Sequence, residues 1–188
     1  MSDTIRTFVA VKVVALPELF AVLKSLAAMR WPVVAVPPDK LHVTLKFLGE
    51  TPLEMCDDIQ RQIARAVSGQ PPIPVRVETL GAFPTTIRPS VVWAGLVDAD
   101  PLVAIAKRLE SLLEPLGFAR ESRPFHPHLT LARIKGRPPR ELFDLLRRHA
   151  ETRFGTFEVR SVEFMQSERQ RDGAHYSTLA SWELRPLP

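Results

Sequence analysis

Two short stretches of this chain match each other, His-Val-Thr-Leu in the first half and His-Leu-Thr-Leu in the second. The first contains His42 and Thr44, and the second contains His128 and Thr130, each pair on an apolar background. Because successive side chains of an extended strand point to opposite faces, the histidine and threonine of each pair share a face and lie about 7 Å apart. The sequence therefore predicts two strands that each present an imidazole and a hydroxyl on the same side.

A single His-x-Thr arises by chance, and a lone half-buried histidine is more often a hydrogen-bonded structural residue than a catalyst. Two copies in comparable surroundings, one in each half of a chain of 188 residues, instead favour a paired site. If the fold brings the two strands together, two imidazoles and two hydroxyls meet around one small anionic group. Such a set is suited to acid–base chemistry on a phosphate.

The composition is that of an ordinary globular protein, with 45% hydrophobic and 24% charged residues. We expect one domain over residues 1–188 made of two pseudo-symmetric lobes, because no low-complexity tract or long linker divides the chain. No apolar run approaches the roughly 20 residues of a membrane span, and no signal peptide is expected. Cys56 is the only cysteine, which excludes intramolecular disulfides and cysteine-based zinc sites and favours a cytoplasmic location.

The first half of the chain predicts the order strand, helix, strand, helix, strand, strand. A β-branched apolar stretch predicts a strand over 7–14, and Pro17 begins a helix. The apolar stripe of this helix consists of Leu19, Phe20, Leu23 and Leu26. The prolines that follow predict an irregular loop; they are Pro32, Pro37 and Pro38.

The first His-x-Thr lies in a predicted strand over 41–48 that has one face toward the core and one toward solvent or substrate. The core face consists of Leu41, Val43, Leu45 and Phe47, and the opposite face of His42, Thr44 and Lys46. Thr51, Pro52 and Glu54 then predict a capping box at the start of a second helix. The apolar stripe of that helix consists of Ile59, Ile63, Ala66 and Val67. Strands over 75–80 and 90–97, joined by 81–84, complete this half.

The second half repeats this order of elements, which suggests an internal duplication. Asp100 and Pro101 begin a helix that ends at Gly117. The stripe of this helix consists of Leu102, Ile105, Ala106, Leu109, Leu112 and Leu113. The strand with His128 follows, then a helix that begins at Pro138 and runs to about residue 150. Strands over 157–166 and 175–184 form a hairpin, with the turn at 171–174.

The formal charge is +4, and basic residues gather on both sides of the second motif. They are Arg120, Arg123, Arg133, Lys135, Arg137 and Arg140. This cluster is either a solvated basic surface or an electrostatic funnel for a phosphodiester chain.

No phosphate-binding glycine loop or serine nucleophile elbow competes with the two histidines. Cys56 lies in a predicted helix and is more readily a packing residue than a nucleophile. His126 and His128 form a His-x-His that could bind zinc with His42 as the third ligand. We favour a site without metal, because no acidic second shell for these histidines is evident and the threonines suit a phosphate better.

Four segments in this order resemble the two-histidine (2H) phosphoesterase superfamily, and within it the bacterial and archaeal RNA 2′,3′-cyclic phosphodiesterases, historically called 2′-5′ RNA ligases. They are 41–50 with the first motif, Gly-Ala-Phe-Pro at 81–84, 127–133 with the second motif, and 163–167 together with Tyr176. The resemblance implies an α+β fold in which two pseudo-symmetric antiparallel sheets form a central cleft with helices outside, and strands can be exchanged between the lobes. It also implies opening of an RNA 2′,3′-cyclic phosphate to a 2′-phosphate without cofactor or metal.

Carried over by position, the resemblance makes His42 the proton donor and His128 the proton acceptor, with Thr44 and Thr130 holding the phosphate. Arg133 matches a family arginine near the phosphate, although strict alternation puts it on the opposite face of the strand. A bulge or the end of the strand must therefore turn Arg133 toward the histidines. Phe47 is a candidate for stacking on a base, and Phe125 and Tyr176 are weaker ones.

We therefore expect a cytoplasmic, monomeric enzyme that acts on RNA ending in a 2′,3′-cyclic phosphate, with reversible 2′-5′ ligation as a side activity. One alternative is a cyclic phosphodiesterase for a small nucleotide such as ADP-ribose cyclic phosphate. Another is a protein that binds RNA ends without catalysis. A metal-dependent hydrolase would lose its activity in chelator, whereas the two-histidine mechanism would not.

Overall fold

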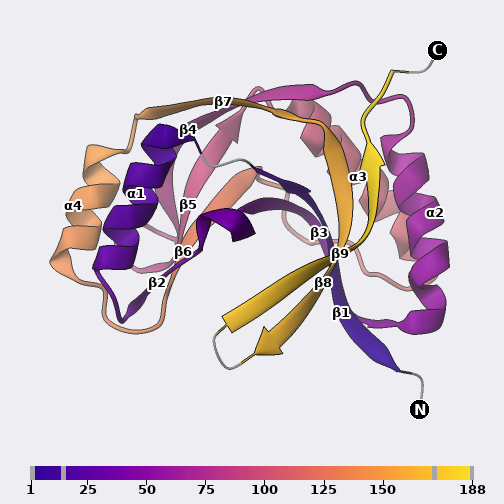
Figure 1. The fold of residues 1–188 in the computed structure, drawn as a ribbon, viewed down its shortest axis with the longest axis horizontal. Helices are drawn as coiled ribbons and strands as arrows, with labels where there is room; N and C mark the ends of the chain where they lie inside the picture. Colours follow the sequence, from indigo (N-terminus) through magenta and orange to yellow (C-terminus); the bar gives the residue numbers. More distant parts are fainter. Residues whose placement is uncertain (1–2, 14–15, 171–172, 187–188) are drawn as a thin grey trace.

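The computed structural model describes residues 3–13, 16–170 and 173–186, which fold into strands and helices that alternate along the chain (Figure 1). The strands are β1 (Thr4–Lys12), β2 (Val33–Ala35), β3 (His42–Pro52), β4 (Ile73–Pro84), β5 (Pro89–Val97), β6 (His128–Ile134), β7 (Arg153–Val159), β8 (Ser161–Gln170) and β9 (Gly173–Glu183). The α-helices are α1 (Pro17–Ala28), α2 (Cys56–Val67), α3 (Asp100–Leu113) and α4 (Arg140–Arg148). Single 3₁₀ turns cover Pro38–Lys40, Leu53–Met55 and Glu114–Leu116.

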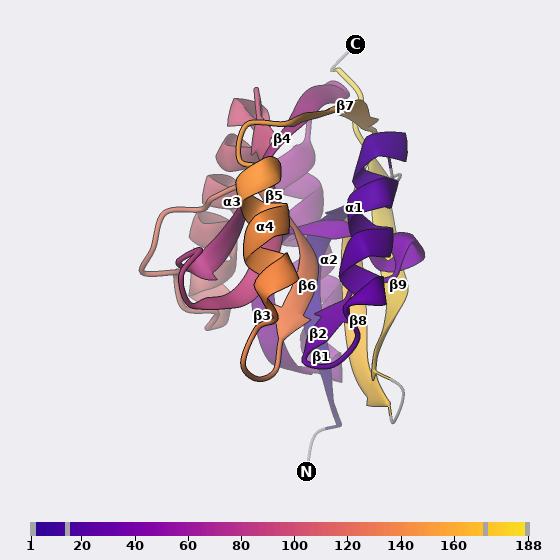
Figure 2. The same ribbon diagram turned by 90° about the vertical axis from the view of Figure 1, so that its left-hand side faces the viewer.

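The strands form two antiparallel sheets, one with the order β3-β1-β8-β9 and the other with the order β2-β6-β5-β4-β7. Helices α1 and α4 lie on one flank of the molecule and α2 and α3 on the opposite flank (Figure 1). After a quarter turn, α1 and α4 face the viewer as neighbours outside the strands (Figure 2). The predicted α+β class, with two antiparallel sheets and external helices, is confirmed.

The sheets do not follow the two halves of the chain. In one sheet the first His-x-Thr strand, β3, pairs with β1, and in the other sheet β6 pairs with β5. Each sheet joins strands from both halves of the chain, since β8 pairs with β1 in the first sheet, and β6 pairs with β5 and β2 in the second. Each sheet is therefore completed by a strand that is distant in sequence.

Apolar side chains from both sheets and all four helices pack into one continuous core. In α1 the core side chains are Leu19, Val22, Leu23 and Leu26, whereas Phe20 is 39% exposed. The predicted place of Phe20 in the stripe is wrong, because one residue turns a helix by about 100° and carries Phe20 away from Leu19. The predicted stripe of α2 is confirmed, and that of α3 is buried apart from Leu112, which is partly buried.

Several predicted boundaries are wrong because strand pairing extends the elements. The predicted loop after α1 contains the short strand β2, which pairs with β6. The predicted linker over 81–84 continues β4. The predicted strand over 157–166 is divided at Arg160 into β7 and β8, which belong to different sheets.

The predicted capping box is also wrong. β3 continues to Pro52 because Thr4 and Pro52 are still register partners in the β1–β3 ladder. Thr51 is buried in this strand, where its hydroxyl lies 2.7 Å from that of Thr7, and α2 begins later, at Cys56.

The hairpin of β8 and β9 is confirmed, since pairing runs as far as Gln170 and Gly173. Two of the predicted turn residues, Arg171 and Asp172, lie outside the described residues, as does Val14 at the predicted end of the first strand. Within the described ranges, none of the helices has the length and hydrophobicity that crossing a membrane requires.

Candidate active site

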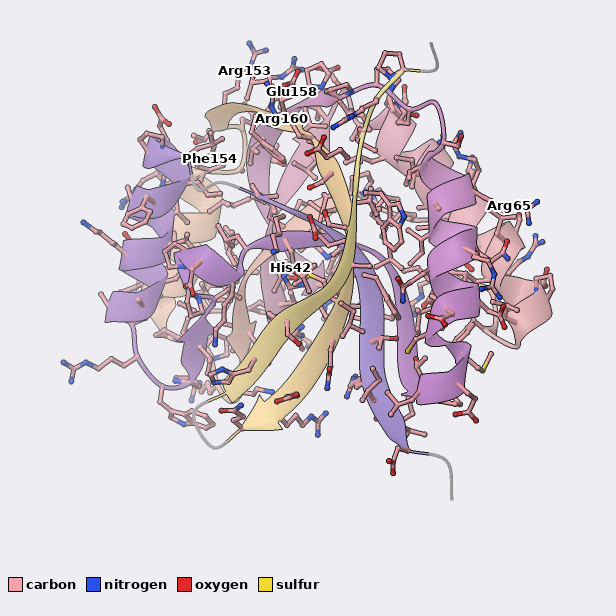
Figure 3. All side chains as sticks on the ribbon, turned by 45° about the vertical axis from the view of Figure 1, so that its right-hand side comes forward. His42, Arg65, Arg153, Phe154, Glu158 and Arg160 are labelled. Carbon is pink, nitrogen blue, oxygen red and sulfur yellow. The ribbon has the colours of Figure 1, made fainter. Side chains whose placement is uncertain are left out.

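The two His-x-Thr strands lie close together, although they belong to different sheets. Parts of β3 and β6 come within 8 Å of each other, measured between Cα atoms. His42 and His128 are the first residues of these strands, and both are half-buried. Figure 3 shows His42 near the middle of the molecule, beside the hairpin of β8 and β9.

The two strands share an irregularity at the same position. In the β1–β3 ladder, Thr44 and Lys46 face successive residues of β1, so that Leu45 between them is left unpaired. In the β5–β6 ladder, Thr130 and Ala132 likewise face successive residues of β5, and Leu131 is left unpaired. One extra residue on one strand of an antiparallel pair is a β-bulge.

This bulge reverses the alternation of side chains that follow it. Before the bulge the histidine and threonine share one face; after it Lys46 points into the core and Phe47 returns to the face of the histidine. The predicted face assignment of Lys46 and Phe47 is therefore wrong, because it assumed strict alternation. In β6 the same reversal exposes Arg133, and the bulge expected at this place is confirmed.

The buried Lys46 is accommodated by a set of polar partners. Its Nζ donates to Oε2 of Glu110 at 2.7 Å and to the carbonyl of Ala119 at 3.0 Å. The same Glu110 oxygen accepts from the backbone N–H of Glu121 at 3.2 Å. Lys46 thus joins β3 to α3 and to the segment that leads into β6.

Both imidazoles are held in the same way by the backbone. Nδ1 of His42 lies 2.8 Å from the carbonyl of Lys40, and Nδ1 of His128 lies 2.7 Å from the carbonyl of His126. A carbonyl oxygen only accepts hydrogen bonds, so each Nδ1 carries a hydrogen. Each Nε2 is then an acceptor when the ring is neutral and a donor when the ring is protonated.

Aromatic rings support both histidines. The ring of His42 lies 5.2 Å from that of Phe8 and 5.0 Å from that of Tyr176, which meets it edge to face. The ring of His128 lies 5.1 Å from that of Phe83, also edge to face. Sequence reasoning missed Phe8 and Phe83 as neighbours of the histidines, since pairing of distant strands brings them there.

The pKa values of both imidazoles are lowered, mainly because burial disfavours the charged form. The hydrogen bonds to the backbone carbonyls oppose this effect. The positive charge of Arg133 lowers the pKa of both His42 and His128, and the charge of His126 also lowers that of His128. Because one guanidinium acts on both rings, the two rings and Arg133 occupy one electrostatic environment.

Three polar side chains of this face remain available for a ligand. The hydroxyls of Thr44 and Thr130 and the guanidinium of Arg133 form no hydrogen bond or ion pair with any residue that the structure describes. Beside Thr130, the indole of its register partner Trp93 lies over Gly81. Its Nε1–H is buried and has no partner within the described ranges.

The remaining candidates from the sequence are two aromatic residues, the cysteine and a metal site. Phe125 is partly buried against the core, whereas Phe47 is 56% exposed. Burial and then the charges of Asp57 and Glu54 raise the pKa of the Cys56 thiol, which weakens it as a nucleophile.

Among the described residues no three His, Cys, Asp or Glu side chains gather in a way that could hold a metal ion, so the zinc triad that includes His126 is not assembled.

This arrangement is suited to in-line displacement at phosphorus. A neutral imidazole accepts a proton from the attacking oxygen while a protonated imidazole donates one to the departing oxygen. Hydroxyl donors and a guanidinium stabilise the negative charge of the non-bridging oxygens.

Comparison with known proteins gives consistent matches over most of the chain. Residues 19–171 match the sequence model of the 2′-5′ RNA ligase superfamily. A protein of Aeropyrum pernix, called an RNA 2′,3′-cyclic phosphodiesterase, is 38% identical over 157 residues, which are 82% of this chain and 88% of that protein. A protein of Archaeoglobus fulgidus with the same name is 36% identical over 95% of this chain and 99% of its own length. The crystal structure of a Thermus thermophilus protein superimposes with a TM-score of 0.79 at 30% identity, over 96% of this chain and 98% of that one.

Proposed function

The chain belongs to the 2′-5′ RNA ligase superfamily, and from this membership and the geometry of its two histidines we propose that it hydrolyses RNA 2′,3′-cyclic phosphate ends to 2′-phosphomonoesters. The enzyme is thus an RNA 2′,3′-cyclic phosphodiesterase. Its relatives in Aeropyrum pernix and Archaeoglobus fulgidus bear that name.

One observation carries the proposal. Two imidazoles on neighbouring strands are held alike, each by Nδ1 on the carbonyl two residues before it, and one arginine acts on both. This leaves two Nε2 atoms for proton transfer at one phosphate. An acid and a base on opposite sides of the phosphorus are what in-line ring opening requires.

In the proposed reaction, Nε2 of His128 takes a proton from water as the water oxygen bonds to phosphorus. The bond between phosphorus and O3′ breaks, and protonated Nε2 of His42 donates its proton to O3′. The products are a free 3′-hydroxyl and a 2′-phosphate. The assignment of donor and acceptor follows the family, since the two sites are alike in their backbone anchoring.

Thr44, Thr130, Arg133 and Phe47 are the proposed substrate-binding residues. The two hydroxyls and the guanidinium have no side-chain partner among the described residues, which favours their use for the phosphate. Phe47 occupies the position of β3 that Arg133 occupies in β6, and it presents an exposed ring for a base. The β3 side of the site is therefore aromatic, and the β6 side is cationic.

The test uses an oligoribonucleotide that ends in a 2′,3′-cyclic phosphate, in the presence of a chelator. We expect the wild type to release a 2′-phosphate product, and His42→Ala or His128→Ala alone to lower kcat by about 10²–10⁴-fold. His149→Ala serves as the control, because His149 pairs with Thr152 outside the motif strands. A 3′-phosphate product, loss of wild-type activity in chelator, or an unimpaired single variant of either motif histidine would contradict the proposal.

The same atoms can carry out 2′-5′ ligation when an RNA 5′-hydroxyl replaces water as the nucleophile, because the same P–O3′ bond then breaks. We propose ligation as a side activity of this kind. We further propose that the protein works as a cytoplasmic monomer without metal. This rests on the single cysteine and on a site whose acid–base groups all come from one chain.

A further inference from the structure

The face that carries the motif side chains continues beyond Arg133 onto another strand. β2 is the edge strand next to β6, and Val34 is the register partner of Arg133. Directly opposed residues of antiparallel strands share a face. Val34 therefore lies beside Arg133, and it is 45% exposed.

Trp31, three residues before Val34, is 73% exposed, more than any other aromatic side chain that the structure describes. Its backbone is nevertheless fixed, since Val33 N–H donates to the carbonyl of Arg30 at 2.7 Å and Lys135 N–H donates to that of Pro32 at 2.9 Å. The chain from Trp31 to Val34 spans at most about 11 Å. A large exposed indole thus lies within three residues of the register partner of Arg133.

Three cations without partners lie on the two chain segments that meet at Pro32, next to Trp31. Arg30, Lys135 and Arg137 are exposed, and none of them forms a side-chain hydrogen bond or ion pair with a residue in the described ranges. Some other surface arginines are neutralised, as Arg76 is by Asp98 and Arg120 by Glu114. The positive charge near Trp31 is therefore available to a polyanion.

We propose that Trp31, Val34, Arg30, Lys135 and Arg137, here called the β2 edge, bind the RNA strand that leads to the cyclic phosphate. This proposal rests on the proposed function and names its substrate class as oligonucleotides. Trp31 stacks on a base on the 5′ side of the terminal nucleotide, and the cations contact the preceding phosphates. An exposed aromatic ring on an anchored backbone, with unpaired cations on the adjoining segments, is the combination that single-stranded nucleic acid binds.

A small cyclic nucleotide fills the site at the histidines but does not reach the β2 edge. The test therefore compares kcat/KM for a 2′,3′-cyclic mononucleotide with that for an oligoribonucleotide of about six nucleotides that ends in the same group. We expect the wild type to prefer the oligonucleotide. The ratio of kcat/KM for the oligonucleotide to kcat/KM for the mononucleotide should fall by about 5- to 100-fold in Trp31→Ala. Trp31→Phe, which keeps a stacking ring, should retain most of the ratio.

Two control variants match these changes. Phe20→Ala removes an exposed ring from the opposite end of α1, and we expect it to leave the ratio unchanged. Lys135→Ala should reduce the slope of log Kd for the oligonucleotide against log salt concentration by about one. Lys107→Ala, on the exposed side of α3, should leave that slope unchanged.

The outcomes separate this proposal from the proposed function. If the wild type hydrolyses both substrates equally well, or if Trp31→Ala leaves their ratio unchanged, the β2 edge does not bind RNA, although the enzyme remains a cyclic phosphodiesterase. If Trp31→Ala instead alters the sedimentation coefficient of the protein with that ratio unchanged, the edge is a contact between copies of the chain and the proposal is wrong. If neither substrate is hydrolysed, both proposals fail.

Discussion

Arg133 is the side chain that makes the two halves of the site different. β3 and β6 carry the same His-x-Thr, the same bulge and the same backbone anchor for the imidazole, but after the bulge β3 presents Phe47 and β6 presents Arg133. The shared face of each histidine and its threonine can be predicted from sequence, because a period of two is enough to place them together. Lys46 and Phe47 were misplaced because a single unpaired residue reverses every later side chain.

Replacing Arg133 with glutamine should move the pH profile upward. The guanidinium lowers the pKa of both imidazoles, so its removal raises both pKa values. In a plot of kcat/KM against pH, the rising limb follows deprotonation of the base and the falling limb deprotonation of the acid in the free enzyme. We therefore expect both limbs to move to higher pH in Arg133→Gln.

The maximum of that profile should fall by about 10- to 100-fold, because the charge-assisted contact with the phosphate that we propose for Arg133 is lost. Arg65→Gln, on the outer side of α2 (Figure 3), is the matched control and should leave the profile in place. A profile that stays in place or moves to lower pH in Arg133→Gln would show that this arginine does not act on the imidazoles.

Strands and helices were predicted best where their own pattern decides them, and worst where a distant partner does. The stripe of α2 is a local pattern and was found. β2 has only three residues and exists through its pairing with β6, which is distant in sequence. At 51–54 the local capping pattern competes with pairing to β1, and the pairing prevails because Thr51 is buried against Thr7.

The ion pair of Lys46 and Glu110 gives a prediction about how β3 is attached to α3. Lys46→Met leaves the carboxylate of Glu110 without its cation, and the side chain of Glu110 is only 19% exposed. We expect the free energy of unfolding to fall by about 3 kcal/mol, as for other buried pairs that lose one partner. Urea unfolding followed by circular dichroism measures this change.

The double variant Lys46→Met/Glu110→Leu should recover most of the lost stability, because no unpaired charge is then left in the interior. Lys107→Met on the exposed side of α3 controls for the change of side chain. A double variant that is as unstable as Lys46→Met would mean that the stability comes from the contact of Lys46 with the carbonyl of Ala119, in the segment between α3 and β6, rather than from the ion pair.

The two sheets and their exchanged strands bear on how many domains the chain contains. One continuous core includes Val9 and Val43 from the first sheet and Val92 and Leu129 from the second. Each sheet pairs strands from both halves of the chain, β1 with β8 in the first sheet and β5 with β6 in the second. We therefore propose that residues 1–188 form a single domain whose two lobes cannot fold separately.

Two tryptophans allow this proposal to be tested, because Trp93 lies in β5 of one sheet and Trp182 in β9 of the other. In one variant Trp31 and Trp182 are changed to Phe, and in the other Trp31 and Trp93 are. The fluorescence of the one tryptophan left in each variant then reports on one sheet. A single domain unfolds as one cooperative unit. We therefore expect the urea midpoint from fluorescence to coincide with that from circular dichroism in each variant, even if the variants differ in stability. A fluorescence midpoint that precedes the circular dichroism midpoint in either variant would show that its sheet unfolds independently, and the single-domain proposal would then be wrong.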